Sequence, residues 1–311
     1  MLFGLYMGEI LNSYRKKKAI LHNQNYVGRD ESNVLILDEV DVSRKHALIF
    51  WENGNWYFSD VSRNGTKVNN KHVHQATVQL EKGDVIQFSK SNESIWEISE
   101  IKPPSSYLKP IDPNSNPIAI GKGIFLPVDG KIEGTVFQDI SLNWVLDNGL
   151  EQMTLKNGER FVINSQEYTF IKNEYLAETE LNIDVTKDAC FLFTVSSDEE
   201  TVSGKILIND LIMDLGDRVY NHLLLQLCRA KLLDYEISDW VYTEELEKIL
   251  SKELLKEVDA YYINTLIHRL RKKLFSLTPY GHLFANIIER KKGKIRFGMD
   301  KFKIEKEAAL Q

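Results

Sequence analysis

Short strand-like runs dominate the first hundred residues of the chain. Val34–Leu37, Ala47–Trp51 and Trp56–Ser59 are rich in aliphatic and aromatic residues, and polar turns separate them. Runs of this length that are bounded by Asn, Asp, Ser and Gly are typical of β-strands. The pattern therefore predicts an all-β domain over residues 1–103.

A second β-rich region follows a segment that is rich in proline. Five of the seven prolines lie between Pro103 and Pro117, and proline fixes φ and lacks a backbone N–H donor. The strand-like runs that come next are Gly123–Leu126, Gly134–Phe137, Ser141–Leu146, Arg160–Ile163 and Tyr168–Ile171. We therefore interpret residues 104–187 as a Pro-rich linker and a β-rich middle region.

The spacing of apolar residues changes from about Ala189 onward. Three further strand-like runs come first: Cys190–Val195, Thr201–Ile208 and Leu211–Leu215. Apolar residues then recur at helical spacing over Val219–Cys228. Strands followed by helices indicate a separate α+β domain, which we place at residues 188–311.

Two more helices and a hairpin complete this domain. Thr243, with acids in the turn after it, is expected to cap one helix. Val258–Leu277 is the strongest helical pattern in the chain and carries one apolar stripe. The stripe consists of Ile263, Leu266, Ile267, Leu270 and Leu274. Phe284–Ile288 and Lys294–Phe297 are expected to form a β-hairpin, so the whole pattern predicts a winged helix-turn-helix.

Basic charge is concentrated on the last helix and the hairpin. Between His268 and Arg296 there are nine Lys and Arg residues and one acid, whereas the whole chain has a net charge of −6. Cations neutralise DNA phosphates, and a helix can read bases in the major groove. The residues expected to contact DNA are Tyr261, Asn264, Thr265, His268, Arg269, Arg271, Lys272, Arg290, Lys291, Lys292 and Lys294. A merely solvated basic face and a protein-docking surface remain alternatives.

Donor side chains gather on the turns of the first domain. They are Arg29, Ser43, Arg44, Arg63 and Asn64. Guanidinium, hydroxyl and amide donors suit a small dianion such as a phosphate. Because loops held at the ends of strands often carry binding groups, we expect an anion site at these turns.

Four short motifs in one order resemble a forkhead-associated (FHA) domain. They are Gly28-Arg29, Ser43-Arg44-Lys45-His46, Asp60–Asn69 and Leu80–Ile86. The resemblance covers roughly residues 14 to 100. It implies an eleven-stranded β-sandwich whose loops bind phosphothreonine in a partner protein.

The resemblance also implies roles for individual residues. Arg29 and Ser43 hold the phosphate, Arg44 adds a cation, and Asn64 bonds the peptide backbone, whereas Arg63 lies in a loop that varies within the family. Three residues are expected to be structural in that site: Gly28, His46 and Gly65. His46 is expected to brace two loops rather than to act in catalysis, and the two glycines fit sharp turns.

The middle region echoes part of this pattern. Leu155–Phe161 repeats the spacing of Leu80–Ile86, and a strand-like run follows each of them. A degenerate second sandwich and an unrelated β-rich spacer are both consistent with the echo. A second sandwich would lack the phosphate site, because Ser-Arg-x-His and Asn-Gly-Thr do not occur in it.

The C-terminal domain is similar to a second family. Ile267–Leu274 followed by Ile287–Arg290 resembles the recognition helix and wing of response-regulator effector domains of the OmpR/PhoB type. Phe193–Glu200 and Asp214–Arg218 look like segments of bacterial regulators that join an FHA domain to such an effector. This resemblance covers about residues 189 to 298 and implies a winged helix that binds duplex DNA.

The sequence carries no recognisable catalytic, metal or cofactor motif. Gly-rich phosphate loops, nucleophile elbows, paired metal-binding cysteines and His-Glu-x-x-His do not occur. We therefore expect no enzyme activity, no metal and no cofactor. Cys190 and Cys228 are too few and too far apart for a disulfide framework, and no signal peptide or membrane span is evident. These features favour a cytoplasmic protein.

The leading hypothesis joins the two resemblances in one bacterial transcription regulator. A Ser/Thr kinase phosphorylates a partner, the FHA domain reads the phosphothreonine, and the winged helix binds double-stranded DNA. RNA polymerase is a further candidate partner. The alternative is a phospho-dependent scaffold, in which the winged helix binds protein rather than DNA.

Overall fold

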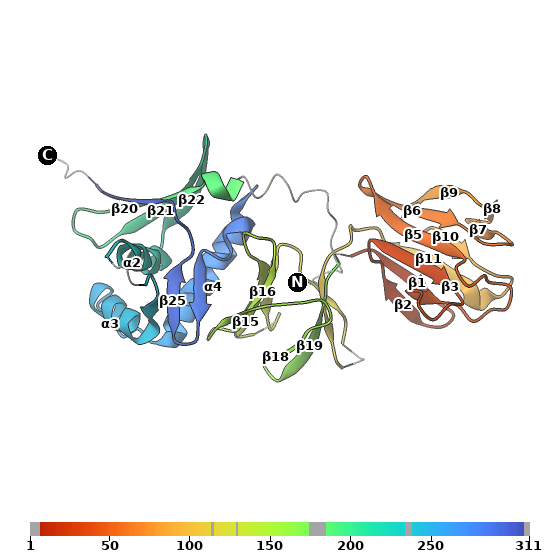
Figure 1. Cartoon of the computed structure of the whole chain (residues 1–311), viewed down its shortest axis with the longest axis horizontal. Coiled ribbons are helices and arrows are strands. Elements are labelled where there is room, and N and C mark those ends of the chain that lie inside the picture. Colours follow the sequence, from red (N-terminus) through yellow and green to blue (C-terminus); the bar gives the residue numbers. More distant parts are fainter. Residues whose placement is uncertain (1–6, 113–114, 129, 174–184, 234–237, 308–311) are drawn as a thin grey trace. The chain divides into compact units, whose positions relative to one another are not determined.

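The computed structural model describes residues 7–112, 115–128, 130–173, 185–233 and 238–307. The chain divides into two compact units, and Figure 1 labels many of their elements. The first unit contains residues 1–121 and 169–176, and the second contains residues 122–168 and 177–311. The predicted middle region, residues 104–187, is therefore shared between the two units.

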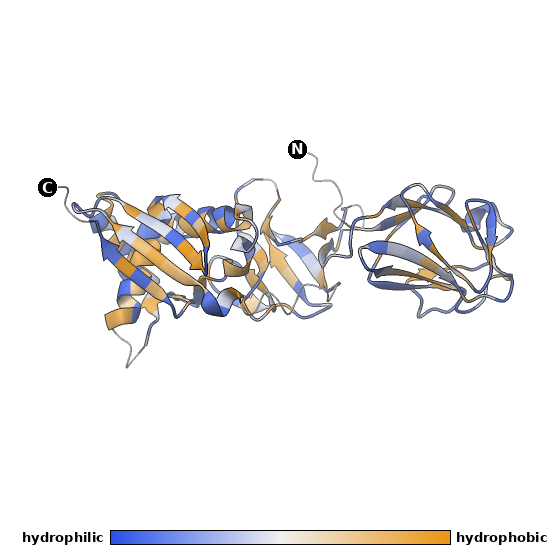
Figure 2. Cartoon of the chain, turned by 90° about the horizontal axis from the view of Figure 1, so that it is seen from above, coloured by the Kyte–Doolittle hydropathy of each residue, from blue (hydrophilic) through white to orange (hydrophobic). Residues whose placement is uncertain are grey.

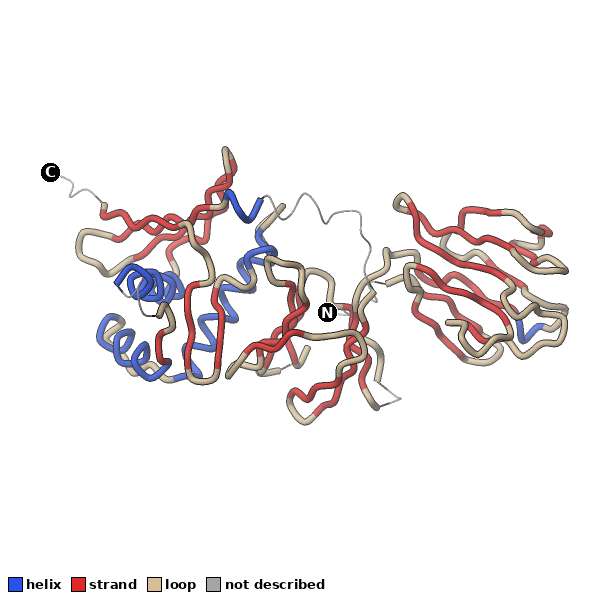
Figure 3. The backbone as a smooth tube through the Cα atoms, viewed as in Figure 1, coloured by secondary structure: helices blue, strands red, loops and turns tan. Residues whose placement is uncertain are grey.

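Eleven strands of the first unit form a β-sandwich of two sheets, as the sequence predicts (Figure 3). One sheet has the order β2-β1-β11-β10-β7-β8 and the other has the order β4-β3-β5-β6-β9. The first sheet contains β1 (Glu9–Asn12), β2 (Lys17–Ile20), β7 (Thr66–Val68), β8 (Lys71–Val73), β10 (Val85–Gln87) and β11 (Ile95–Glu100). The second contains β3 (Gln24–Gly28), β4 (Leu35–Ile36), β5 (Ala47–Glu52), β6 (Asn55–Asp60) and β9 (Thr77–Leu80). The unit also contains a 3₁₀ turn, η1 (Asn92–Ser94), and the paired strands β12 (Tyr107–Pro110) and β13 (Ile118–Ala119).

Alternation along these strands builds the core of the sandwich. In β6, Trp56 and Phe58 are buried, whereas the residues between and beside them are partly exposed. Successive side chains of a strand point to opposite faces, so one face of the sheet is apolar. Ile49 and Ile86 are buried in the same core. Figure 2 shows the hydrophobic residues gathered on the strands and hydrophilic ones in several connecting loops.

The second unit begins with a four-stranded antiparallel sheet, which we call the middle sheet. Its strands pair in chain order: β14 (Gly123–Leu126), β15 (Gly134–Gln138), β16 (Trp144–Asp147) and β17 (Gln152–Thr154). Strands β18 (Arg160–Ile163) and β19 (Gln166–Ile171) follow along the chain.

The middle sheet repeats the pairing of part of the sandwich. Its order β14-β15-β16-β17 matches the neighbours β3-β5-β6-β9, and all of these pairs are antiparallel. The registers also match: Thr135 pairs with Phe125 and Asp147, and Ala47 pairs with Val27 and Asp60. Asp147 therefore occupies in the middle sheet the position that Asp60 occupies in the sandwich.

The echoed turns of the two regions have the same hydrogen bonds. The backbone N–H of Glu81 donates to Asp84 Oδ2 at 2.7 Å, and the backbone N–H of Lys156 donates to Glu159 Oε2 at 2.7 Å. Strand register and turn geometry therefore match between the middle sheet and this part of the first domain.

Helices and strands make up the rest of the second unit. A four-stranded sheet with the order β22-β21-β20-β26 contains β20 (Cys190–Val195), β21 (Val202–Ile208), β22 (Leu211–Asp217) and β26 (Phe302–Lys306). Three longer helices follow: α2 (Val219–Leu233), α3 (Thr243–Glu253) and α4 (Ala260–Ser276). A three-stranded sheet with the order β23-β25-β24 contains β23 (Val241–Tyr242), β24 (Ile288–Lys291) and β25 (Lys294–Phe297), and the 3₁₀ turn η3 (Gly281–Phe284) precedes β24. Among the described residues, no helix is long and apolar enough to cross a membrane.

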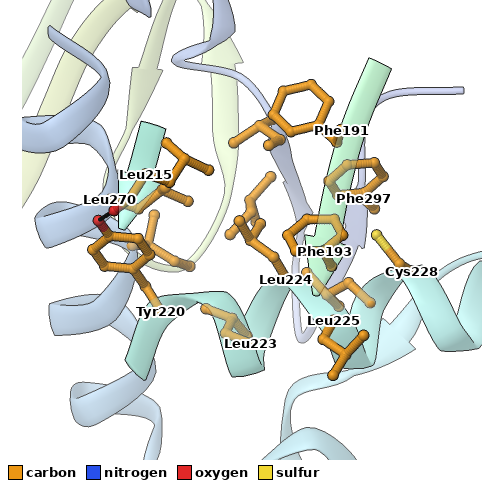
Figure 4. Close-up of a cluster of buried hydrophobic side chains, with 14 of the residues drawn as sticks. Phe191, Phe193, Leu215, Tyr220, Leu223, Leu224, Leu225, Cys228, Leu270 and Phe297 are labelled. Carbon is orange, nitrogen blue, oxygen red and sulfur yellow. Dashed lines mark hydrogen bonds between the residues drawn. The ribbon is translucent and has the colours of Figure 1, made fainter. Parts of the chain in front are cut away.

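One apolar core joins these helices to both sheets. Phe191, Phe193 and Phe297 meet the leucines of α2 in the close-up of Figure 4. The Tyr220 hydroxyl donates to the carbonyl of Leu215 at 2.6 Å, so its polar end is satisfied inside the core. The predicted apolar stripe of α4 is buried in this core, which confirms that prediction.

Two local predictions in this part of the chain are wrong. Thr243 does not cap α3, because Tyr242 occupies the cap position and makes no side-chain cap bond. Phe284–Ile288 is not a strand: Phe284 ends η3 and is buried in the core, and β24 begins only at Ile288, where pairing with β25 starts. An apolar run can be buried in a core without pairing as a strand, and its hydrophobic pattern does not distinguish a buried strand from a buried turn or loop.

Candidate functional site

Three loops of the sandwich converge at one edge. The backbone N–H of Arg29, directly after β3, donates to the carbonyl of Ser43 at 3.1 Å. The backbone N–H of Arg63, in the loop after β6, donates to Ser43 Oγ at 3.3 Å. Ser43 therefore lies between the two arginine-bearing loops. We call Arg29, Ser43, Arg44, Arg63 and Asn64 the loop cluster.

The other members of the loop cluster are also fixed through their neighbours. Asn64 Nδ2 donates to the carbonyl of Asp41 at 3.0 Å. The carbonyl of Arg44 accepts from the backbone N–H of Asp30 at 3.1 Å and from Asn33 Nδ2 at 2.7 Å. The backbone is thus held while the side chains of Arg44 and Asn64 are exposed.

The guanidinium groups of the loop cluster retain unused donors. Arg29, Arg44 and Arg63 are all exposed, and none of them forms an ion pair with a carboxylate of the described residues. Arg29 commits only its Nε, which donates to the carbonyl of Val42 at 2.7 Å. Each guanidinium carries five N–H donors in a planar fork. The arrangement therefore presents several free donors to an anion at one edge of a rigid sheet.

His46 lies beneath the loop cluster and is fully buried. The backbone N–H of Ser43 donates to His46 Nδ1 at 3.0 Å, and His46 Nε2 lies 3.0 Å from Thr66 Oγ1. Since Nδ1 accepts, the neutral ring carries its proton on Nε2 and donates it to Thr66. Burial lowers the pKa of His46, against a smaller opposing effect of Asp60. A neutral, buried ring that joins two loops acts as a brace rather than as an acid or base.

Asp60 completes this brace, and sequence reasoning gave it no role. Thr66 Oγ1 donates to Asp60 Oδ2 at 2.7 Å, while the backbone N–H groups of Ser62 and Gln75 donate to Asp60 Oδ1 at 3.2 and 3.1 Å. The signal for it was present in the sequence, because an acid at the end of a strand followed by Ser62 is a common start of a turn.

Gly28 and Gly65 occupy positions where a larger residue does not fit. Gly28 has φ +150°, and a Cβ there would lie 2.3 Å from the carbonyl oxygen of Arg44. Gly65 has φ +80°, and a Cβ there would lie 2.3 Å from His72 Nε2. Both glycines therefore permit the close approach of the loops.

The predicted DNA-contacting face of α4 lines a groove of about 720 Å³ in the second unit. Six of the predicted residues line it: Tyr261, Asn264, Thr265, His268, Arg269 and Lys272. Residues 130–133 and 148–149, which connect strands of the middle sheet, line it as well. Burial lowers the pKa of His268 to about 4, and nearby Arg271 acts in the same direction.

Arg271 and Arg290, which the sequence places on the DNA-contacting surface, are buried instead. Arg271 Nη2 donates to Asp147 Oδ2 at 2.7 Å, and Arg290 Nε lies 3.1 Å from the same oxygen. Burial alone would raise the pKa of Asp147, but the two guanidinium groups lower it to about 2. Asp147 lies 124 positions before Arg271 in the chain, so no local pattern reveals this partner.

The predicted hairpin lysines remain closer to solvent. Lys291 and Lys292 are exposed and Lys294 is half-buried. Lys291 Nζ lies 4.4 Å from the ring centre of Trp240, and Lys294 Nζ lies 4.1 Å from that of Tyr242. Among the described residues, no cluster of three or more His, Cys, Asp or Glu side chains is placed to hold a metal ion.

Comparison with known proteins gives a family match within the first unit and several similar solved structures. No curated protein matches the chain. A solved structure from a study of phosphothreonine-dependent FHA domain interactions is 28% identical over 30% of this chain and 96% of its own, with a TM-score of 0.27. The FhaA FHA domain complexed with the intracellular domain of Rv3910 is 30% identical over 29% of this chain and 98% of its own, with a TM-score of 0.26.

A third structure is Mycobacterium tuberculosis EmbR in complex with a low affinity phosphopeptide. It is 25% identical over 29% of this chain, with a TM-score of 0.27, and this chain covers 24% of it. The family model of the FHA domain matches residues 25–89. That range runs from β3 to β10 and contains every member of the loop cluster. Residues 25–89 of this chain are an FHA domain.

Proposed function

We propose that the FHA domain binds phosphothreonine in a partner protein through the loop cluster. FHA domains bind phosphothreonine peptides, which supports phospho-dependent recognition of a partner. The observation that carries the proposal is the set of guanidinium groups around Ser43 that form no ion pair with a described carboxylate. Arg29 and Arg44 supply charge and forked donors to the phosphate, Ser43 supplies a hydroxyl, and Asn64 lies beside them for the peptide backbone.

Binding of the full chain to matched phosphothreonine and threonine peptide libraries tests this proposal. We expect binding that requires the phosphate and that competes with free phosphopeptide. Equal binding of both libraries would remove the phosphothreonine assignment.

Gly28→Ala is expected to weaken phosphopeptide binding roughly tenfold, because the added Cβ strains the backbone and displaces the Arg44 carbonyl. Peptide titration followed by fluorescence anisotropy measures the loss. Gly83→Ala is the matched control, since Gly83 also has a positive φ but a Cβ there meets no atom within 4 Å. Equal effects of the two changes on the Kd would show that the close approach of Gly28 to the Arg44 backbone is not required for peptide binding.

We further propose that residues 188–311 are a winged helix that binds duplex DNA. The order of three strands, three helices and a hairpin supports this reading, as does the cationic surface of α4 and the hairpin. In this proposal the chain is a cytoplasmic bacterial transcription regulator, and RNA polymerase is a candidate further partner. No cofactor or enzyme activity is part of the proposal.

Arg269→Ala/Lys272→Ala tests the DNA proposal, because both side chains are exposed on α4. Arg271 is unsuitable for this purpose, since its loss would remove one of the two guanidinium groups that face buried Asp147. The affinity of the full chain for a short duplex is measured across a salt series. We expect the slope of log K against log salt to become shallower by about two, roughly one for each phosphate contact removed.

The matched control replaces two exposed lysines elsewhere in the second unit, Lys205→Ala/Lys303→Ala, and should leave the slope unchanged. If both double variants behave alike, α4 does not contact the duplex. The phospho-dependent scaffold then becomes the better reading. One observation favours that alternative already: Tyr261 and Asn264 of the predicted DNA-contacting face are in contact with connections of the middle sheet.

A further inference from the structure

The middle sheet packs against the side of α4 that its apolar stripe leaves free. The ring centre of Phe125 lies 6.2 Å from that of His268 and 5.6 Å from that of Phe275. The Arg271 guanidinium lies over the Phe137 ring, 4.4 Å from its centre. A Cβ at Gly123 would lie 2.3 Å from the Phe275 ring. The helix therefore packs on its own core along the apolar stripe and on the middle sheet along the neighbouring flank, while Arg269 and Lys272 remain exposed.

Two connections of the middle sheet reach the face that is predicted to read DNA. A Cβ at Gly149 would lie only 3.0 Å from Asn264 Nδ2, so the backbone after β16 is in contact with that side chain. Lys131 Nζ, between β14 and β15, lies 4.1 Å from the ring centre of Tyr261. Both contacts fall on residues that a recognition helix would present to bases.

This arrangement is incompatible with insertion of α4 into a major groove. A helix with its side chains is about 10–12 Å in diameter, and the major groove of B-DNA is about 12 Å wide. A helix alone therefore fills the groove, and no room remains for a second backbone at contact distance from Asn264. DNA binding through this face requires the middle sheet to move away.

The ion pair at the centre of this contact has more positive than negative charge, which does not suit a permanent interface. A single carboxylate, Asp147, faces two buried guanidinium groups. Arg271 Nη1 and Arg290 Nη2 have no hydrogen-bond acceptor among the described residues. Removing charges from water offsets much of their mutual attraction, so such a contact is specific without being strongly stabilising. The ion pair fixes one arrangement of the middle sheet on α4, and duplex DNA can still displace the sheet.

The position of Asp147 gives this anchor a structural origin. Asp147 has the strand register of Asp60, and both carboxylates accept a backbone N–H two residues later, from Gly149 at 2.8 Å and from Ser62 at 3.2 Å. In the FHA domain the remaining carboxylate oxygen accepts a hydrogen bond from Thr66, which joins the brace under the loop cluster. In the middle sheet the corresponding oxygen binds Arg271 and Arg290 instead.

We propose that residues 122–168 are an intramolecular cover, derived from a second FHA-like sheet, that holds α4 away from duplex DNA and is anchored by Asp147. The proposal rests on the DNA binding proposed above and adds its regulation. Opening the cover exposes the face of α4 and also returns Arg271 and Arg290 to solvent, where they add to the cationic surface.

Asp147→Asn in the full chain tests the cover, because the amide keeps the shape of the side chain and removes its charge. Hydrogen exchange over residues 122–168 reports whether the cover opens, and exchange in α2 reports whether the helical core stays folded. Titration with a short duplex at low salt reports the affinity. We expect faster exchange in residues 122–168, protected α2, and at least tenfold tighter binding than in the wild type.

Glu151→Gln is the matched control, since it makes the same chemical change at an exposed position four residues later, between β16 and β17. The Glu151 carboxylate forms no ion pair with another described residue. Glu151→Gln should match the wild type in exchange and affinity. Phe125→Ala is the second variant, because it weakens the apolar contact with Phe275 and changes no residue of α4. Phe125→Ala should change hydrogen exchange and DNA affinity in the same direction as Asp147→Asn. It replaces Asp147→Asn as the test if that variant unfolds the second unit.

Each other outcome overturns the proposal in a distinguishable way. If the cover opens and the duplex binds with unchanged affinity, the cover is not inhibitory, and the DNA proposal stands. If neither variant opens it, Asp147 is not the anchor of a reversible contact. If no form binds the duplex even when the cover is open, the proposed DNA binding is wrong and the inference fails with it.

Discussion

Replacing Asp147 with alanine lowers the free energy of unfolding of the second unit by about 3–5 kcal/mol, the usual cost of removing one partner from a buried ion pair. The change leaves Arg271 and Arg290 without a counter-charge in a site where their side chains are 1% and 3% exposed. The contact between the middle sheet and α4 is weakened most, because Asp147 lies on β16 of that sheet whereas Arg271 lies on α4 and Arg290 on β24.

Urea denaturation of the full chain, with hydrogen exchange to separate the two units, measures this loss. Glu151→Ala is the control, since it removes an exposed carboxylate and should change stability by no more than about 0.5 kcal/mol. Equal stability of the two variants would mean that the ion pair contributes nothing to the fold.

The stabilisation by Asp147 should also depend on pH in a defined direction. Its pKa is about 2 in the folded chain and about 3.9 in an unfolded one. A lowered folded pKa means that the stabilisation is fully present above about pH 4 and is lost as pH falls from 4 to 2. The stability difference between wild type and Asp147→Ala should therefore shrink over that range. A difference that stays constant down to pH 2 would contradict this assignment.

Replacing Arg29 with alanine weakens phosphopeptide binding by about 2–3 kcal/mol, which is roughly 30- to 150-fold in Kd. The exposed guanidinium has lost no donors to a carboxylate of the described residues, so a phosphate is free to take two of them. The carbonyl of Val42 already holds Nε and so orients the fork. Alanine removes both the charge and this orientation.

Titration of the full chain with a labelled phosphothreonine peptide measures the effect. Arg29→Lys separates charge from geometry: it retains a cation but not the planar fork, and we expect an intermediate loss. Arg160→Ala removes an exposed arginine in the second unit and should leave the affinity unchanged. If Arg29→Ala binds as tightly as Arg160→Ala, the loop cluster is not the phosphate site.

Local features of the fold were accessible from the sequence. The strands β14, β18 and β20 begin and end where apolar runs do, and the stripe of α4 is buried as its spacing predicts. The loop cluster was also accessible, because its members sit in short motifs at turns. Where apolar residues filled a core without forming a strand, as at Phe284, the pattern misled.

The positions of the side chains in the loop cluster and on the α4 surface therefore have different origins. The sequence by itself determined the FHA domain, since each of its donors is positioned by the turn in which it lies and by strands next to it. Only the tertiary structure decided the state of Arg271 and Arg290. Their exposure depends on whether an acid from a distant strand lies against them, and hydrophobic spacing along α4 carries no information about Asp147. Burial of a charge is a property of the packed pair, so it appears only once both partners are in place.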